Sequence, residues 1–436
     1  MQKYLFIIIS LFIIAGAPLN ADPTGGQVVL DKDTGGKWWM LVDGKPFFIK
    51  GVGRMDHPEL ARACGVNTIR RYNSRDVADT LNELEAAKAR HVKIIRGISV
   101  GRESATFSYG NPDQVKAQRE RIRKIVQTFR DHPALLCWGL GNESERITAP
   151  GKDTEYWREL YWKELNVLAG IVKQEDPAHP VINVIAGNSP RKIAMMKKFA
   201  PAIDIIGINS YAAAVLTSAR LDQAKWDKPF ILTEFGPRGH WEVPRTRWRV
   251  PVEPSSEAKA DNYVRGYRAV ADDLRCLGTV CFVWSDKQEI TGTWYGMFLQ
   301  SGEKTPAVDR LSLLYTGKPL SNLSPVIKKL SSKLDRAYVA PGKGFSAEIV
   351  AEDNENDPLT YEWKVIRESG VEWAIGDYEP IPPTIAGCIL PPGNTARIEL
   401  RTPEVPGAYR LFVYVRDGKG GGAVQNMPFM VRLCQN

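Results

Sequence analysis

Two glutamates in this chain of 436 residues each follow a run of apolar residues. Glu143 comes after the stretch 135–142, and Glu234 comes after the stretch 229–233. Runs of this kind are typical of strands that are buried on both faces of a parallel sheet. Two carboxylates can cleave a glycosidic bond, because one can protonate the leaving oxygen while the other attacks the sugar or activates water. Glu143 and Glu234 are therefore our candidate catalytic residues.

The spacing of the two glutamates indicates how they are positioned. Glu234 lies 91 positions after Glu143, which corresponds to about three strand-plus-helix units of roughly 30 residues each. The two residues can then end strands four and seven of one barrel. In a barrel of eight such units, the carboxyl ends of all strands meet on one face, where catalytic residues lie.

The remaining periodicity supplies the other units, so we predict an α/β chain with a (β/α)8 TIM barrel. A hairpin with the turn Asp43-Gly44 precedes the barrel. Helices are expected at 76–90, 111–132, 154–174 and 256–277, and the first of them is expected to bury Val77, Leu81, Leu84 and Ala87. Strands are expected at 50–53, 65–72, 91–97, 135–143, 180–185, 203–211, 229–234 and 279–286.

The composition along the chain indicates three successive segments. Residues 1–21 have a short basic start, an apolar run and a small residue near a cleavage point, as in a secretory signal peptide. The apolar run is shorter than the roughly 20 residues that span a bilayer, so we expect an exported protein, periplasmic or secreted, without stable membrane insertion. Residues 22–320 form the predicted barrel with its hairpin. Residues 321–436 contain short strand-like runs between Gly and Pro clusters, which predict an immunoglobulin-like β-sandwich.

Charge and cysteines limit the partners and cofactors. The net charge is +8, but the basic residues are scattered and no nucleic-acid motif accompanies them, so we expect no nucleic-acid partner. The six cysteines have no metal-ligand spacing, and we expect a monomer without metal or cofactor. Cys276 with Cys281, or Cys388 with Cys434, are alternative disulfides in an exported chain, and the second pair is favoured. The acidic turn at 353–357 is interpreted as solvated rather than as a calcium site.

Five motifs on the predicted strands resemble one clan of retaining glycoside hydrolases, whose glutamates end strands four and seven. The barrel is most similar to the catalytic domain of glycoside hydrolase family 2 and to the related bacterial β-1,3-glucanases, over roughly residues 36–317. The motifs are Asn67-Thr68-Ile69-Arg70, Trp-Gly-x-Gly-Asn-Glu ending in Glu143, Asn-Ser-Tyr ending in Tyr211, Thr-Glu-Phe-Gly around Glu234, and Val283-Trp284.

The resemblance implies a role for each of these residues. Glu143 would be the general acid/base and Glu234 the nucleophile. Asn142 would bind the 2-hydroxyl of the sugar, an interaction that strengthens in the transition state. Arg70 and Tyr211 would orient Glu234, and the cation would lower the pKa of that carboxyl.

Several further residues are weighed as substrate contacts. Trp284 would form an apolar floor for a sugar ring, or else fill the barrel. Trp241 and Trp248 lie in the long loop 237–248 and either line a cleft or pack with arginines. Arg71 is the alternative to Arg70 if the strand register differs. Three more residues are expected near the same face, as substrate contacts or as solvated groups: Glu145, Asp286 and Glu289.

Our first functional hypothesis is an exported retaining β-glycoside hydrolase that cleaves a polysaccharide as an endo-acting β-1,3-glucanase. Family 2 enzymes usually carry domains before the barrel, and none is predicted here, which favours an open cleft. The alternatives are a β-glucan transglycosylase, an exo-β-glycosidase of the galactosidase, glucuronidase or mannosidase type, and a non-catalytic carbohydrate-binding surface protein. The presence of both glutamates argues against the last of these.

Overall fold

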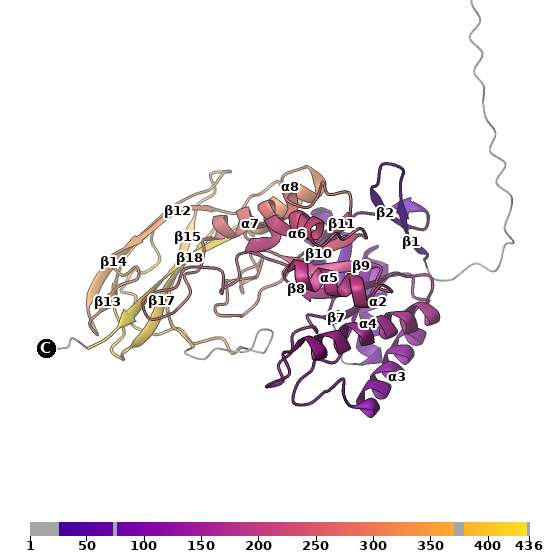
Figure 1. Ribbon diagram of the computed structural model, residues 1–436. Coiled ribbons are helices and arrows are strands. Elements are labelled where there is room, and N and C mark those ends of the chain that lie inside the picture. The colour runs from indigo at the N-terminus through magenta and orange to yellow at the C-terminus, as the bar shows by residue number, and fades with distance from the viewer. Residues whose placement is uncertain (1–25, 73–75, 370–378, 434–436) are drawn as a thin grey trace, which may run out of the picture.

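The computed structural model describes residues 26–72, 76–369 and 379–433. A barrel surrounded by helices forms one part of the molecule, and a layered β-structure forms the carboxyl-terminal part (Figure 1). The predicted signal peptide at 1–21 lies outside the described residues. Within the described ranges, no helix has both the length and the apolar character needed to cross a membrane.

Eight parallel strands close into the predicted barrel. The last strand pairs with the first through Gly278 opposite Ile49 and Cys281 opposite Val52. Most residues of these strands are buried, which explains the apolar runs in the sequence. In barrel order the strands are β4 (Ile49–Gly53), β5 (Thr68–Arg71), β6 (Lys93–Ile98), β7 (Leu135–Asn142), β8 (Val181–Ala186), β9 (Ile205–Asn209), β10 (Phe230–Phe235) and β11 (Cys276–Cys281).

Helices follow the strands and surround the barrel (Figure 1). Capping side chains fix some of their starts: Asp76 accepts a hydrogen bond from the backbone of Asp79 at 2.7 Å, and Asn111 accepts from Asp113 at 3.1 Å. The helices are α1 (Pro58–Ala63), α2 (Val77–Ala89), α3 (Pro112–Phe129), α4 (Glu155–Glu175), α5 (Pro190–Phe199), α6 (Thr217–Gln223), α7 (Ser256–Arg268) and α8 (Pro306–Thr316), with the short 3-10 helix η1 (Ala212–Leu216) before α6.

The buried face of α2 differs from the prediction. Leu84 and Ala87 are buried as expected, but Val77 and Leu81 are 53% and 41% exposed. Thr80 is buried in their place, because its hydroxyl accepts a hydrogen bond at 2.9 Å from the buried guanidinium of Arg96 in β6. A buried cation needs a polar partner, and this requirement turns the helix away from its most apolar face.

The eighth unit is also shifted relative to the prediction. Helix α7 ends at Arg268 and strand β11 covers 276–281, whereas the sequence predicted a helix to 277 and a strand over 279–286. The carboxylate of Asp273 accepts hydrogen bonds from the backbone and side chain of Arg275, at 2.9 and 3.0 Å. This local turn leads the chain into β11 earlier than predicted. Trp284 and Asp286 therefore lie in the loop after the strand.

A small antiparallel sheet lies against the amino-terminal end of the barrel. It consists of β1 (Val28–Lys32), β2 (Trp38–Val42) and β3 (Lys45–Pro46). The predicted turn is present, and Asp43 and Gly44 have φ values of 50° and 75°, as the tight hairpin turn requires. Val28, Met40 and Val42 pack in one cluster with barrel residues such as Ile49. The carboxyl ends of the strands lie at the opposite end of the barrel.

The carboxyl-terminal part is a β-sandwich of two packed sheets, as predicted from the Gly- and Pro-flanked strands. One sheet contains β12 (Val326–Ser332), β14 (Gly344–Glu352) and β16 (Arg397–Arg401). The other contains β13 (Tyr338–Val339), β18 (Gly422–Val431), β17 (Gly407–Arg416) and β15 (Thr360–Arg367). The immunoglobulin-like assignment of this domain and the boundaries 22–320 and 321–436 stay predictions. The Gly- and Pro-flanked runs of the sequence did not indicate β12 or β13, the second of which has only two residues.

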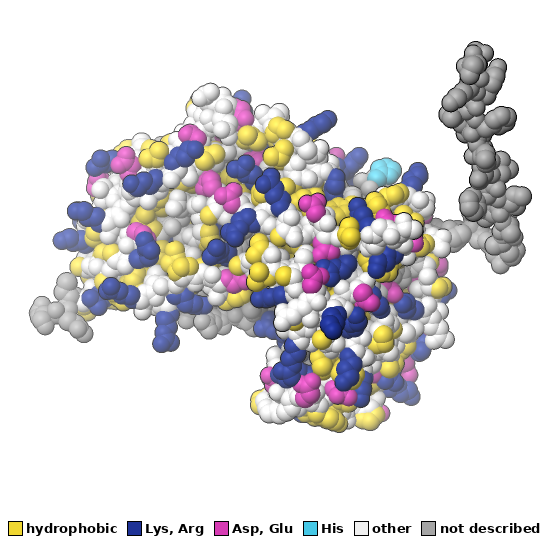
Figure 2. Space-filling view, turned by 45° about the horizontal axis from the view of Figure 1, so that its top comes forward, with side chains coloured by type: hydrophobic (Ala, Val, Ile, Leu, Met, Phe, Trp, Pro, Cys, Tyr) yellow, Lys and Arg dark blue, Asp and Glu magenta, His cyan; other side chains and the backbone are white. Residues whose placement is uncertain are grey.

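The cysteines and the surface give two further results. Cys276 and Cys281 are buried free thiols in β11, so the disulfide between them is excluded. The favoured partner of Cys388, Cys434, lies outside the described residues. Figure 2 shows Lys and Arg side chains spread over the visible face with Asp and Glu among them, in agreement with the scattered charge of the sequence.

The sandwich is bound directly to the barrel. The hydroxyl of Ser256 in α7 donates to the carbonyl of Val424 at 3.0 Å and accepts from its N–H at 2.9 Å. The buried guanidinium of Arg410 in β17 donates to the carbonyl of Pro251 at 2.6 Å. A side chain of α7 thus satisfies backbone groups of the sandwich, and a sandwich arginine satisfies a backbone carbonyl of the loop that follows β10.

Candidate active site

The two candidate glutamates lie at the carboxyl-terminal face of the barrel, on the predicted strands. Glu143 directly follows β7, the fourth barrel strand, and Glu234 lies in β10, the seventh. Glu143 has a φ of 52°, which is uncommon for a residue with a side chain and is often found at functional sites. Its side chain is 18% exposed, whereas that of Glu234 is 9% exposed. The more accessible carboxyl is thus the predicted acid/base.

Arg70 binds both strand ends at once. The side chain comes from β5 and is buried. Its guanidinium donates to Oε1 of Glu234 at 2.9 Å and to Oδ1 of Asn142 at 2.6 Å. Arg71 points away from the site and pairs with Glu83 of α2 at 3.4 Å, because successive side chains of a strand alternate in direction. The structure therefore places Arg70 at the glutamates and excludes Arg71.

Asn209 is a site residue that the sequence analysis did not single out. It ends β9 and is buried. Its amide nitrogen donates to Oε1 of Glu143 at 2.9 Å and to Oδ1 of Asn142 at 3.1 Å. Its amide oxygen accepts from Arg70 at 3.3 Å and from the hydroxyl of Thr233 at 3.0 Å. The signal available in the sequence was its position two residues before Tyr211, inside the quoted Asn-Ser-Tyr motif.

Aromatic side chains form a wall beside Glu234. The hydroxyl of Tyr211 donates to Oε2 of Glu234 at 2.9 Å. The ring of Tyr211 meets those of Trp241, Phe282 and Tyr295 edge-on, with centroids 5.7, 6.0 and 5.9 Å apart. Trp241 is 47% exposed, so this predicted substrate contact presents a ring surface to solvent next to the site. Such a surface suits the apolar face of a sugar.

The pKa of Glu234 is raised above its ordinary value. Burial is the largest cause, and the negative charge of Glu143 acts in the same direction. Arg70 lowers this pKa, as the sequence analysis expected, and the hydroxyls of Tyr211 and Tyr72 also lower it. These three groups do not outweigh the loss of solvation. Tyr72, whose ring lies 4.3 Å from the guanidinium carbon of Arg70, is a second site residue that the sequence analysis missed.

Two predicted tryptophan contacts pack against other aromatic rings. Trp284 has 0% exposure and packs against Phe298 at 5.3 Å between ring centroids, so it presents no open face to a sugar. Trp248 packs against Tyr338 of the sandwich at 5.2 Å. Its position in the loop after β10 could not reveal that this end of the loop turns toward the other domain.

Two of the three charged residues expected near the face have protein partners. The carboxylate of Glu145 is buried and accepts from the backbone of Ala186 at 2.8 Å and from Lys192 at 2.9 Å, so it stabilises the loop. Glu289 pairs with Lys287 at 3.0 Å. Asp286 is half-buried in the same loop. In the described parts of the chain, no three Asp, Glu, His or Cys side chains are grouped in a way that could hold a metal ion.

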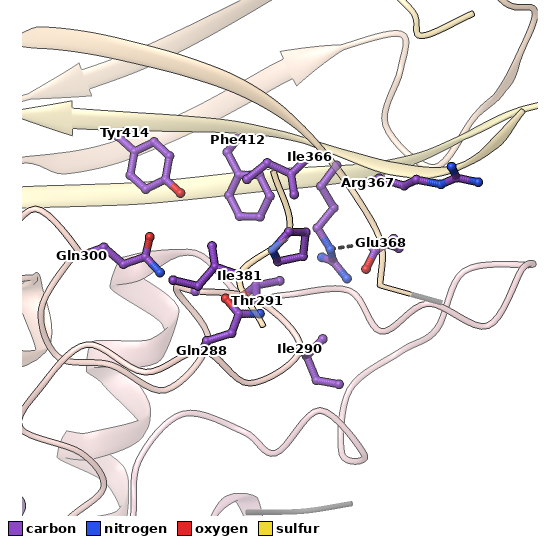
Figure 3. A pocket seen from close by; sticks show the side chains of 13 residues that line it. Gln288, Ile290, Thr291, Gln300, Ile366, Arg367, Glu368, Ile381, Phe412 and Tyr414 are labelled. Atoms are coloured by element: carbon purple, nitrogen blue, oxygen red, sulfur yellow. Dashed lines mark ion pairs between the residues drawn. The ribbon is translucent and has the colours of Figure 1, made fainter. Parts of the chain in front are cut away.

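A pocket between the two domains lies apart from the glutamates. The loop after β11 contributes Gln288 and Gln300, and the sandwich contributes Phe412 and the ion pair between Glu368 and Arg410 (Figure 3). None of the predicted site residues lines it. Residues of both domains line this pocket, and we assign the pocket to the interface between the domains.

Comparison with known proteins agrees with this geometry. Residues 81–240 match the family model described as "Glycosyl hydrolases family 2, TIM barrel domain". A β-galactosidase of Pectobacterium atrosepticum is 27% identical over 158 residues, which cover 33% of this chain and 14% of that protein. The β-galactosidase large subunit of Latilactobacillus sakei is 27% identical over 222 residues, which cover 45% of this chain and 32% of that protein.

Solved structures show the same fold at low identity. A β-glucuronidase of Bacteroides uniformis has a TM-score of 0.53 and 15% identity, covering 93% of this chain and 48% of that one. A β-galacturonidase of Eisenbergiella tayi with bound galacturonate has a TM-score of 0.50 and 19% identity, covering 67% of this chain and 54% of that one.

The chain therefore spans a third or less of these two curated relatives and about half of these two solved structures. The four proteins do not include a β-1,3-glucanase, so that part of the predicted resemblance stays unsupported. The family model covers both Glu143 and Glu234. Over the segment that carries its two candidate catalytic glutamates, this chain is similar to the TIM barrel domain of glycosyl hydrolases family 2.

Proposed function

We propose that this protein is a retaining β-glycoside hydrolase of the galactosidase or glucuronidase type. The observation that carries the proposal is one hydrogen-bond network, through Arg70 and Asn209, that holds the carboxyls of Glu143 and Glu234 at the ends of strands four and seven. A pair of carboxyls at one bond is what glycoside hydrolysis needs. The curated relatives described above are β-galactosidases, which supports this type over the endo-acting β-1,3-glucanase of our first hypothesis.

In the first step, a carboxylate oxygen of Glu234 attacks the anomeric carbon. The bond from that carbon to the leaving oxygen breaks, its electron pair stays on the oxygen, and the proton of Glu143 neutralises that oxygen. Arg70 and Tyr211 hold Glu234 in the attacking orientation through one hydrogen bond to each carboxylate oxygen. A covalent glycosyl ester on Glu234 and a carboxylate on Glu143 result.

In the second step, Glu143 takes a proton from water, and the oxygen of that water forms a bond to the anomeric carbon. The ester bond to Glu234 breaks, and both glutamates return to their starting states. Asn142 accepts hydrogen bonds from Arg70 and Asn209 through Oδ1, so its amide N–H groups are the atoms that can reach a sugar hydroxyl. Replacement of the water by a sugar hydroxyl would give the transglycosylase alternative.

The test is hydrolysis of a panel of aryl β-glycosides (galactoside, glucuronide, galacturonide, glucoside, mannoside) together with laminarin. We expect release of the aryl group from at least one β-glycoside and a product that first appears with β configuration. Glu143→Ala should recover aryl-glycoside turnover with added azide, because azide needs no general base. Cleavage of laminarin alone would favour the endo-acting glucanase instead. Absence of any turnover would leave the non-catalytic carbohydrate-binding protein as the better reading.

Export is a separate proposal that rests on residues 1–21 alone. It predicts that the mature protein, expressed from its full sequence, begins near residue 22 and is found outside the cytoplasm. Cell fractionation tests the location, and amino-terminal sequencing of the purified protein tests where the mature chain begins. A mature chain that still begins at Met1 would contradict the proposal.

A further inference from the structure

The solvent-facing oxygen of Glu143 is occupied by an arginine. Nη1 of Arg146 lies 3.2 Å from Oε2 of Glu143, while Asn209 binds Oε1 from the barrel interior. The Arg146 side chain is 45% exposed, and Glu143 is its only ion-pair partner among the residues that the structure describes. Arg146 thus approaches the acid/base from outside, and no second protein carboxylate fixes it there.

The position of Arg146 determines which part of the substrate it contacts during the reaction. Because Oε1 of Glu143 already accepts a hydrogen bond from Asn209, Oε2 is the oxygen that is left to carry a proton to the leaving group. The leaving oxygen and the sugar attached to it must then come within hydrogen-bonding distance of Oε2. They enter the space in which the guanidinium of Arg146 lies, so Arg146 either contacts the leaving sugar or is displaced by it.

A second arginine approaches Glu143 from the neighbouring strand. Nη2 of Arg102, in the loop after β6, donates to the backbone oxygen of Glu143 at 3.3 Å. Arg102 is half-buried, and the described part of the chain offers it no carboxylate within 4.0 Å. The adjacent Glu103 does not neutralise it, because Glu103 is buried and paired with Lys152 at 2.8 Å. One guanidinium group therefore binds the carboxylate of Glu143, and a second binds its backbone oxygen, at this edge of the site.

We propose that the leaving-group side of the site recognises an acidic sugar, one that carries a carboxylate or a sulfate, through Arg146 and Arg102. This inference rests on the proposed function and names the substrate class on one side of the cleaved bond. Guanidinium groups bind both kinds of anion through paired N–H donors. An anion that binds Arg146 draws it from Oε2 of Glu143 and leaves that oxygen to the leaving group. Arg146 is then a specificity-determining residue.

The competing explanation is an ordinary surface ion pair. Residues three apart often pair in this way, and exposed pairs contribute little. The chain offers a matched comparison in Arg123 of α3, which is 42% exposed and pairs with Glu175 at 3.0 Å on the outside of the barrel. Arg123→Gln removes an equivalent charge and an equivalent ion pair at a site that no substrate reaches.

The experiment uses three disaccharides that share the non-reducing sugar found in the aryl-glycoside panel. The second sugar is glucose, glucuronate or glucose 6-sulfate, so the last two arms distinguish carboxylate from sulfate. We expect the full-length protein to have a kcat/KM at least about tenfold higher for one acidic disaccharide than for the neutral one. Arg146→Gln should reduce this ratio to near one, Arg102→Gln should reduce it in part, and Arg123→Gln should leave it unchanged.

Equal kcat/KM values for the three disaccharides would overturn the inference, and so would a ratio that survives in Arg146→Gln. The failure of the proposed function has a different signature, namely no turnover of any β-glycoside. Calorimetric binding of the same disaccharides to Glu234→Gln, which cannot form the covalent bond, then still reports the anion preference. An acidic preference in binding that disappears in the double variant with Arg146→Gln supports the inference without any turnover.

Discussion

Glu234 in the active-site face and Glu253 at the contact with the sandwich are both buried carboxylates that lie beside a cation. Glu253 is bound by Lys259, by the hydroxyls of Thr291 and Thr293 at 2.7 and 2.8 Å, and by Asn426 of the sandwich at 2.7 Å. The side-chain donors of Glu234 are Arg70 and Tyr211, each at 2.9 Å. Each oxygen of Glu253 thus has two side-chain donors, whereas each oxygen of Glu234 has one.

The two pKa values differ accordingly. Burial raises both, but the surrounding cations and hydroxyl donors bring the pKa of Glu253 below its ordinary value. The pKa of Glu234 stays raised, since its fewer donors do not outweigh burial and the nearby Glu143 adds a repulsive charge. With two donors on each oxygen, Glu253 stabilises the fold. Incomplete solvation and a second carboxyl nearby mark the carboxylate that can react. The following predictions test this contrast.

The largest effect is expected from Glu234→Gln. The amide preserves the shape of the side chain but cannot form the covalent ester, so kcat/KM should fall by at least about 1,000-fold. In this variant Arg70 keeps its acceptors on Asn142, Asn209 and Thr233. The raised pKa of Glu234 also means that its ionised form adds no net stability. Thermal unfolding should therefore change little. Steady-state kinetics on the best substrate of the panel, with circular dichroism as the folding control, checks both. Activity within tenfold of the wild type would contradict the assignment of the nucleophile.

Glu253→Gln should lower the stability of the fold rather than the activity. It leaves Lys259 buried without its counter-charge, and breaking a buried pair of this kind costs about 3 kcal/mol of unfolding free energy. Urea denaturation at neutral pH measures the loss, with the exposed Glu85→Gln as control. Because the pKa of Glu253 is lowered, its stabilisation exists above the unfolded pKa and is lost as the pH falls through the folded one. The difference between variant and wild type should therefore shrink in acid. An unchanged urea midpoint at neutral pH would show that Glu253 does not hold the domains together.

Tyr211→Phe should shift the pH dependence of activity. Glu234 must be ionised to attack, so kcat/KM falls as the pH drops through its pKa. The lost hydroxyl stabilised the ionised form, and its removal raises that pKa and moves the acid limb of the profile to higher pH. The loss of one hydrogen bond to a charged group should also lower kcat by about tenfold.

Tyr295→Phe is the matched control for this shift. The hydroxyl of Tyr295 contacts the backbone N–H and the ring of His240 rather than Glu234, so the acid limb should stay at the wild-type position. An acid limb that moves to lower pH in Tyr211→Phe, or that moves equally in both variants, would contradict the role given to Tyr211.

Much of the arrangement around Glu234 could be predicted from the sequence. Apolar runs that end in Glu143 and Glu234 indicated the two strands, and their spacing indicated strands four and seven of a barrel. The choice of Arg70 over Arg71 depended on strand alternation relative to the barrel axis, for which the sequence allowed both registers. Asn209 stands in the quoted Asn-Ser-Tyr motif but was missed, because the motif does not show that its amide reaches Glu143.

The contact between the barrel and the sandwich could not be predicted from the sequence in this way. Glu253 lies in a long loop, and its partners come from α7, from the loop after β11 and from β18. Their separation along the chain gives no periodic signal. For the same reason, the contact of Trp248 with Tyr338 and the burial of Trp284 against Phe298 could not be read from the sequence. Local patterns predict elements, whereas contacts between loops depend on the assembled fold.

The smallest expected effect separates two tryptophans that the sequence treated alike. Trp241 is 47% exposed beside Tyr211, so Trp241→Ala should raise KM by about fivefold through the loss of a stacking surface and should leave the urea midpoint unchanged. Trp248→Ala removes the contact with Tyr338 of the sandwich and should lower the urea midpoint while KM stays the same. Kinetics and denaturation of both variants measure the two outcomes side by side. A KM effect in Trp248→Ala equal to that in Trp241→Ala would mean that the loop acts as one unit and that the active site and the domain contact are not separate.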